Sequence, residues 1–109
     1  MIVSEKNVTD ALAYLADDPH PTALARYDVT MAENKAKQIF ARLYLSYSGP
    51  VAEREHRSTC NPEYMQAKDE EAESIKELER HKARTRAAEM LLECWRTENA
   101  NARAAERIR

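Results

Sequence analysis

The sequence predicts an all-α protein: a long antiparallel helical hairpin with a short N-terminal helix, coiled-coil-like and oligomeric. Its 109 residues include one Gly and four Pro, too few for the turns of a many-stranded β-fold. Apolar residues make up 43%, charged residues 33% and aromatic residues 6%, a profile typical of a solvated helical chain with a thin core. After Pro62 no Gly or Pro follows, and strong helix formers dominate.

Local signals mark where each helix begins and ends. Asn7 is a capping residue before an apolar stripe, and Pro19 then breaks the first helix. Gly49 followed by Pro50 is a C-terminal stop, and Asn61 before Pro62 is the N-cap of the last helix. The expected single domain, 1–109, contains helices over 7–17, 21–48 and 62–98, and a basic tail over 99–109.

A short connection between the long helices favours antiparallel packing. We expect one or two helical turns over 51–57 and a loop over 58–61, and the last helix is polar nearly all round over 79–86. Burying a Leu or a Trp is worth about 1.5–3 kcal/mol, and so small a chain cannot bury both apolar stripes, so we predict a homo-oligomer. The residues expected in its interface are Ile39, Leu43, Ile75, Leu78, Leu91, Leu92 and Trp95.

The net charge of −2 hides an asymmetry along the chain. Residues 1–79 hold nine Lys and Arg against fifteen acids, whereas residues 80–109 hold eight against four. A basic segment behind an acidic one binds either a polyanion or the acidic part of another copy. Single-strand binders combine such charge with aromatic rings, and Tyr44, Tyr47 and Trp95 supply them here, although rings at this spacing also suit a core.

Catalytic and metal chemistry are poorly supported. With one Gly there is no turn for an oxyanion site, so we expect no enzyme and no cofactor. His56 and Cys60 have a spacing that zinc ligands use, but His20, His81 and Cys94 offer no second close pair. We therefore interpret His56 and Cys60 as loop residues and expect no metal site.

The remaining features bear on location. No apolar run approaches the roughly 18–20 residues that cross a bilayer, and the first residues do not resemble a secretion signal. We expect a cytoplasmic protein of a host cell, with no membrane partner. In that reducing compartment Cys60 and Cys94 stay thiols and serve as small packing residues.

One segment carries a resemblance to a known family. Ala41-Arg42-Leu43, followed by Tyr47-Ser48-Gly49, is similar to a segment of phage recombination mediators of the UvsY type. The order of long helix, this segment, polar loop and long helix also matches, over roughly residues 24–100. Trp95-Arg96-Thr97 and the residues after it resemble small helical phage and prophage proteins.

The resemblance implies an oligomer that binds single-stranded DNA and assists loading of a recombinase. A Lys-x-Arg in the family contacts DNA; Arg42 matches its arginine, Phe40 stands in place of the lysine, and Lys37 is one turn earlier. We thus predict a phage-type accessory protein of DNA recombination or replication, with itself, single-stranded DNA and a recombinase or another host or phage protein as partners. The expected nucleic-acid-binding residues are Lys37, Arg42, Arg80, Lys82, Arg84, Arg86, Arg96 and Arg103.

Two alternatives from other classes stay open. An anti-defence inhibitor of the anti-CRISPR kind would bind a host protein through its acidic helix face, here Asp69-Glu70-Glu71-Ala72-Glu73 with Glu77 and Glu79. Three neighbouring acids without obvious cationic partners in the chain favour such an intermolecular role. The other alternative is a structural coiled-coil subunit with no ligand.

Overall fold

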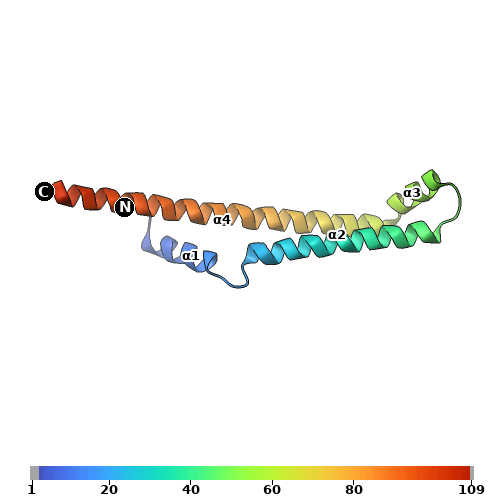
Figure 1. Ribbon diagram of the computed structural model, residues 1–109, viewed down its shortest axis with the longest axis horizontal. Coiled ribbons are helices and arrows are strands. Elements are labelled where there is room, and N and C mark those ends of the chain that lie inside the picture. Colours follow the sequence, from blue (N-terminus) through green and yellow to red (C-terminus); the bar gives the residue numbers. More distant parts are fainter. Residues whose placement is uncertain (1–2, 109) are drawn as a thin grey trace. The chain divides into compact units, whose positions relative to one another are not determined.

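The computed structural model describes residues 3–108, and all regular structure among them is helical (Figure 1). The all-α class is therefore confirmed for this part of the chain. The residues up to Thr22, together with Arg80 and those after it, form one compact unit, and Ala23–Glu79 form a second. Helix α4 contributes residues to both units. The four helices are α1 (Glu5–Leu15), α2 (Pro21–Ser46), α3 (Val51–Cys60) and α4 (Pro62–Ile108).

Helix α1 lies two residues nearer the N-terminus than the range 7–17. Ser4 is its N-cap, and the Ser4 side chain accepts a hydrogen bond of 3.2 Å from the Asn7 amide. Asn7 thus lies in the first turn instead of capping it. The helix ends at Leu15, because Asp18 precedes Pro19 and the residue before a proline disfavours helical backbone.

In the first unit α1 packs along α4 (Figure 1). Ala11 and Tyr14 of α1 and Ala88 of α4 form the buried cluster. Leu91 and Leu92, which were expected in an interface between copies, pack against this cluster inside the chain. The attachment of α1 to α4 therefore depends on one small apolar cluster.

In the second unit α2 packs along the first half of α4. Lys35 pairs with Glu70 at 2.9 Å, the Phe40 and Tyr64 rings meet edge to face at 5.3 Å, and Arg42 pairs with Glu63. Later residues of α2 therefore contact earlier residues of α4. The most deeply buried side chains between them are small, which keeps the core thin and lets the two backbones approach closely; they are Ala25, Ala36 and Ala67.

The end of α2 and all of α3 differ from expectation. Helix α2 stops at Ser46, two residues before position 48, because side chains satisfy its last carbonyl groups. Ser46 donates to the Leu43 carbonyl at 2.6 Å, and Arg54 donates twice to the Tyr44 carbonyl at 3.3 and 3.2 Å. Gly49 then adopts a φ of 114°, as a glycine after a helix commonly does.

A loop was expected over 58–61, but residues 58–60 are the last turn of α3 and only Asn61 is non-helical. The Ser58 hydroxyl donates to the Arg54 carbonyl at 2.8 Å, and the Thr59 hydroxyl donates to the Glu55 carbonyl at 2.9 Å. This back-bonding removes the competition that makes such residues helix breakers. The Asn61 cap is confirmed, since its side-chain oxygen accepts from the Glu63 amide at 2.9 Å.

Helix α4 extends ten residues beyond the expected end at position 98. It is continuous through the polar stretch 79–86 and reaches Ile108, so the residues 99–108 are helical and not a separate tail. Four alanines in this last part favour helix, and a helix already nucleated gains residues at little cost. Position 109 lies outside the described residues.

Candidate nucleic-acid interface

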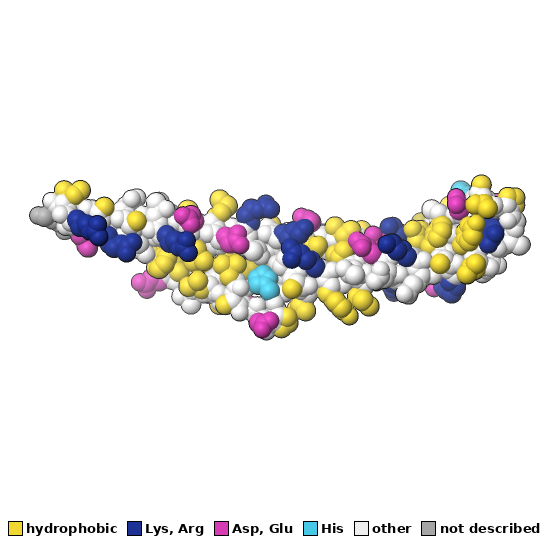
Figure 2. All heavy atoms as spheres, viewed as in Figure 1, with side chains coloured by type: hydrophobic (Ala, Val, Ile, Leu, Met, Phe, Trp, Pro, Cys, Tyr) yellow, Lys and Arg dark blue, Asp and Glu magenta, His cyan; other side chains and the backbone are white. Residues whose placement is uncertain are grey.

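Most basic side chains in the C-terminal half of α4 lie along one side of the helix. At 100° per residue, five of them fall within about 100° of arc and extend over about 38 Å of helix. All but the first, which is half-buried, are exposed. Figure 2 shows Lys and Arg side chains spaced along this part of α4. We call this set the basic stripe; its members are Lys82, Arg86, Arg96, Arg103 and Arg107.

Most of the basic stripe has its charge available to an external anion. Among residues 3–108, Arg86, Arg103 and Arg107 have no ion-pair partner. Arg96 pairs with Glu93 at 3.6 Å, and both side chains are more than two-thirds exposed. Exposed pairs of this kind are worth little and are easily exchanged for another anion.

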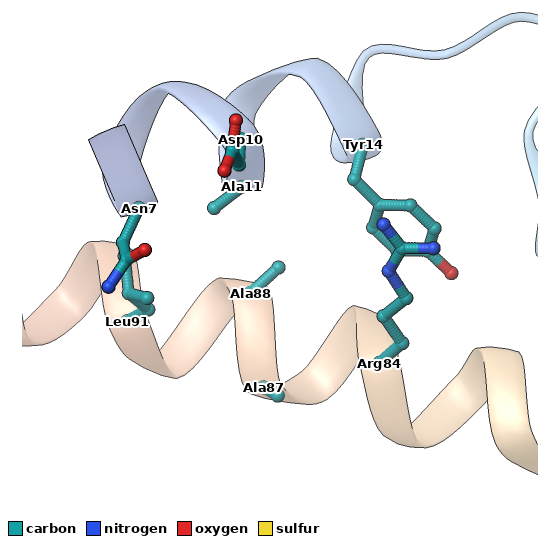
Figure 3. Close-up of a pocket in the computed structure, with 8 residues that line it drawn as sticks. All are labelled: Asn7, Asp10, Ala11, Tyr14, Arg84, Ala87, Ala88 and Leu91. Atoms are coloured by element: carbon teal, nitrogen blue, oxygen red, sulfur yellow. The ribbon is translucent and has the colours of Figure 1, made fainter. Parts of the chain in front are cut away.

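Other predicted DNA-contact residues are already engaged. Arg42 pairs with Glu63, although 58% of its side chain is exposed. Arg84 lies flat on the Tyr14 ring, with its guanidinium carbon 4.1 Å from the ring centre, as Figure 3 shows. Arg80 lies 3.4 Å from the His81 ring nitrogen Nε2, and Lys37 is exposed. At 100° per residue, Arg80 and Arg84 lie on the opposite side of α4 from the basic stripe.

Arg84 belongs to a polar cluster that the sequence analysis missed. The Tyr14 hydroxyl donates to the His81 carbonyl at 3.2 Å, and the Thr85 hydroxyl donates to the same carbonyl at 2.9 Å. Thr22 meets Thr85 through their hydroxyls at 3.2 Å. His20 contacts the Tyr14 ring edge to face at 5.0 Å. Polar side chains in the stretch 79–86 thus face α1 and fix its position on α4.

A shallow hollow of about 250 Å³ lies between α1 and α4 beside this cluster (Figure 3). Asp10 and Tyr14 line it from α1, and Arg84 and Leu91 line it from α4. Three alanines form much of the remaining wall, so the hollow offers few convergent polar groups. Its residues explain how α1 packs, and they do not compose a ligand site.

The acidic stretch of α4 has partners inside the chain. Glu70 pairs with Lys35 at 2.9 Å, Glu71 with Lys68 at 3.0 Å, and Glu73 with Lys76 at 3.2 Å. The hydrogen bond from Lys35, together with its charge, lowers the pKa of Glu70 below the usual glutamate value. The expectation that these acids lack partners is therefore wrong for Glu70, Glu71 and Glu73, because α2 and the neighbouring turns of α4 supply the cations, whereas Asp69 has no ion pair among residues 3–108.

The predicted interface residues divide between buried and accessible positions. Leu43 and Leu78 are buried within the chain, Ile39 and Trp95 are half-buried, and Ile75 is 40% exposed. Larger apolar exposure occurs elsewhere on α2, where the exposed side chains recur at steps of three and four and so share one face. These side chains are Leu24, Tyr27 and Met31, with exposed fractions of 49%, 61% and 50%.

Within the described part of the chain, no three His, Cys, Asp or Glu side chains come together as a metal site in a single copy would require. Along residues 3–108, no helix combines the length and apolar character needed to cross a bilayer. Comparison with protein-family models, with curated proteins and with solved structures finds no match to this chain.

Proposed function

We propose that this protein binds single-stranded DNA through the basic stripe and acts, as an oligomer, as a phage-type accessory of DNA recombination or replication that assists recombinase loading. The observation that carries the proposal is the contrast within α4. Three acids of its acidic stretch pair with lysines, whereas Arg86, Arg103 and Arg107 have no ion-pair partner among residues 3–108. A phosphate backbone supplies the anions that these arginines lack.

The same contrast favours DNA over the anti-defence alternative. A protein partner that used the acidic face would have to replace the pairs of Glu70, Glu71 and Glu73, which gains little net energy at an exposed surface. Binding through Arg86, Arg103 and Arg107 breaks no ion pair among residues 3–108, and binding through Arg96 breaks only its weak pair with Glu93. Release of counterions from the DNA then adds a favourable term that increases as salt decreases.

Self-association is the second part of the proposal. We propose that α2 and α4 form an antiparallel hairpin and that copies pack through the apolar face of α2. Leu24, Tyr27 and Met31 support this, because an exposed stripe at helical spacing is typical of helices that pack against another helix. Association would place several basic stripes along one DNA strand, which raises avidity without new contacts.

The experiment is a fluorescence-anisotropy titration of a labelled single-stranded oligonucleotide with two charge-matched variants. Arg103→Ala with Arg107→Ala removes two charges from the basic stripe. The control, Lys6→Ala with Arg26→Ala, removes two charges from exposed side chains that also lack a described partner. We expect the stripe variant to weaken binding at least tenfold more than the control. Equal loss in both variants would mean that DNA binding depends on net charge and not on the basic stripe.

A further inference from the structure

The outward face of α3 carries a pair of metal-ligating side chains. The sequence analysis interprets His56 and Cys60 as loop residues, but α3 continues to Cys60 and places the two one helical turn apart. The Cys60 sulfur lies 3.9 Å from the His56 ring nitrogen Nε2, and both side chains are exposed. We infer that His56 and Cys60 are two ligands of a zinc site that the same two residues of a second copy of the chain complete.

The distance between the two atoms suits one metal ion. Zinc bonds of about 2.3 Å to sulfur and about 2.0–2.1 Å to nitrogen, at a tetrahedral angle, place these ligand atoms about 3.5 Å apart. The observed 3.9 Å is longer by about 0.4 Å, which a small rotation of either side chain removes. No packing opposes that rotation, because both residues are exposed. The pair is thus already arranged as half of a tetrahedral site.

A single copy cannot finish the site. No third His, Cys, Asp or Glu joins the pair within residues 3–108, whereas structural zinc takes four protein ligands. Two copies related by a two-fold axis supply two sulfurs and two nitrogens, the Cys2His2 set of many structural sites. Each Cys60 releases its thiol proton to solvent as the sulfur–zinc bond forms, so two thiolates neutralise the ion.

The electrostatic surroundings are compatible with a cation. Arg57, the nearest cation on the same face, pairs with Glu53 at 2.8 Å, so its charge is balanced. Ala52, one turn before His56 on the same face of α3, is small and exposed, so it does not block a second copy. The balanced charge of Arg57 and the open surface beside His56 allow the α3 helices of two copies to approach each other.

The chain contains its own control. Cys94 is exposed like Cys60 but lies on α4, where no His is within one turn on either side. A variant Cys94→Ser therefore removes a thiol of equal accessibility without removing a ligand pair. Cys60→Ser and His56→Ala each remove one ligand, and their exposure makes both compatible with folding, which far-ultraviolet circular dichroism checks.

The test titrates Co²⁺, a spectroscopic substitute for zinc, and then Zn²⁺ into the full chain under a phosphine reductant. We expect a thiolate–cobalt absorption band that saturates at one ion per two chains. Zinc should displace cobalt, and light scattering should show the mass of the zinc-bound species fall when a chelator is added. Cys94→Ser should behave as the parent chain, and Cys60→Ser and His56→Ala should lose the band.

Several results would overturn the inference. If the band persists in Cys60→Ser and disappears in Cys94→Ser, the metal binds Cys94 and not Cys60. Saturation at one ion per chain would contradict a shared site. An absent band in the parent chain, with its thiols shown to be reduced, would exclude thiolate coordination altogether.

Discussion

Replacing Tyr14 with Ala should detach α1 from α4 while the second unit stays folded. Tyr14 is 7% exposed and is the largest side chain of the first unit's core. Its ring lies under the Arg84 guanidinium and against His20, and its hydroxyl donates to the His81 carbonyl. The substitution removes all of these contacts at once.

The expected cost follows from burial. Replacing a buried aromatic side chain by Ala costs about 3–5 kcal/mol. The remaining buried side chains of α1 are only Val8 and Ala11, and an isolated helix of 11 residues is marginal in water. At about 1.4 kcal/mol per tenfold, opening of α1 should increase by a factor on the order of 100 to 4,000. Tyr14→Phe, which keeps the ring and loses the hydroxyl, should cost only about 0.5–1.5 kcal/mol.

Hydrogen exchange followed by mass spectrometry measures this opening segment by segment. In Tyr14→Ala we expect the amides of Glu5–Leu15 to lose protection by the factor above, and those of 36–43 and 67–78 to keep theirs. Met65→Ala is the control, because Met65 of the second unit is 54% exposed and its loss should change stability by less than about 0.5 kcal/mol. Equal loss of protection in both units would refute the reasoning, since it would mean that the two units unfold together.

Three further predictions concern single features. Ala36→Leu should destabilise the second unit by about 1–3 kcal/mol, because Ala36 is 3% exposed in its thin core; the matched Ala72→Leu, at an exposed site, should not lower the thermal midpoint. Ser4→Ala should lower protection of α1 by about 1 kcal/mol in hydrogen exchange, through loss of the N-cap bond. Lys35 lowers the pKa of Glu70 in the folded state. The ionised carboxylate therefore stabilises the fold at pH values above the ordinary glutamate pKa of 4.5, and this contribution is lost as the pH falls through the lowered pKa. In Glu70→Gln the urea concentration at half unfolding should depend less on pH over this acidic range. An unchanged pH dependence would contradict the stabilising role of the ionised Glu70.

What the sequence predicts well is local. The Asn61 cap depends on a neighbour two residues away, so a short pattern is sufficient to find it. Ser58 and Thr59 were interpreted as loop formers because their back-bonds to Arg54 and Glu55 exist only once the helix has formed.

The candidate site depends on long-range pairing, which the pattern does not contain. Tyr14 and His81 are 67 residues apart, so the polar stretch 79–86 gave no sign that it faces another helix. Arg42, which the family resemblance assigns to DNA contact, likewise meets Glu63 only when α2 and α4 pack, so the local pattern does not show this pair. The exposed arginines near the end of α4 were accessible to prediction, because no partner of theirs lies elsewhere in the described chain.

The most direct test of the central claim is the salt dependence of single-stranded DNA binding by the full chain. If three to five arginines and lysines of the basic stripe each neutralise a phosphate, the logarithm of the association constant should fall with the logarithm of salt concentration with a slope of about −2 to −3.5. Arg103→Ala with Arg107→Ala should reduce the steepness of that slope by about 1.4. Absence of binding at the lowest salt, or a slope that the variant leaves unchanged, would contradict the account.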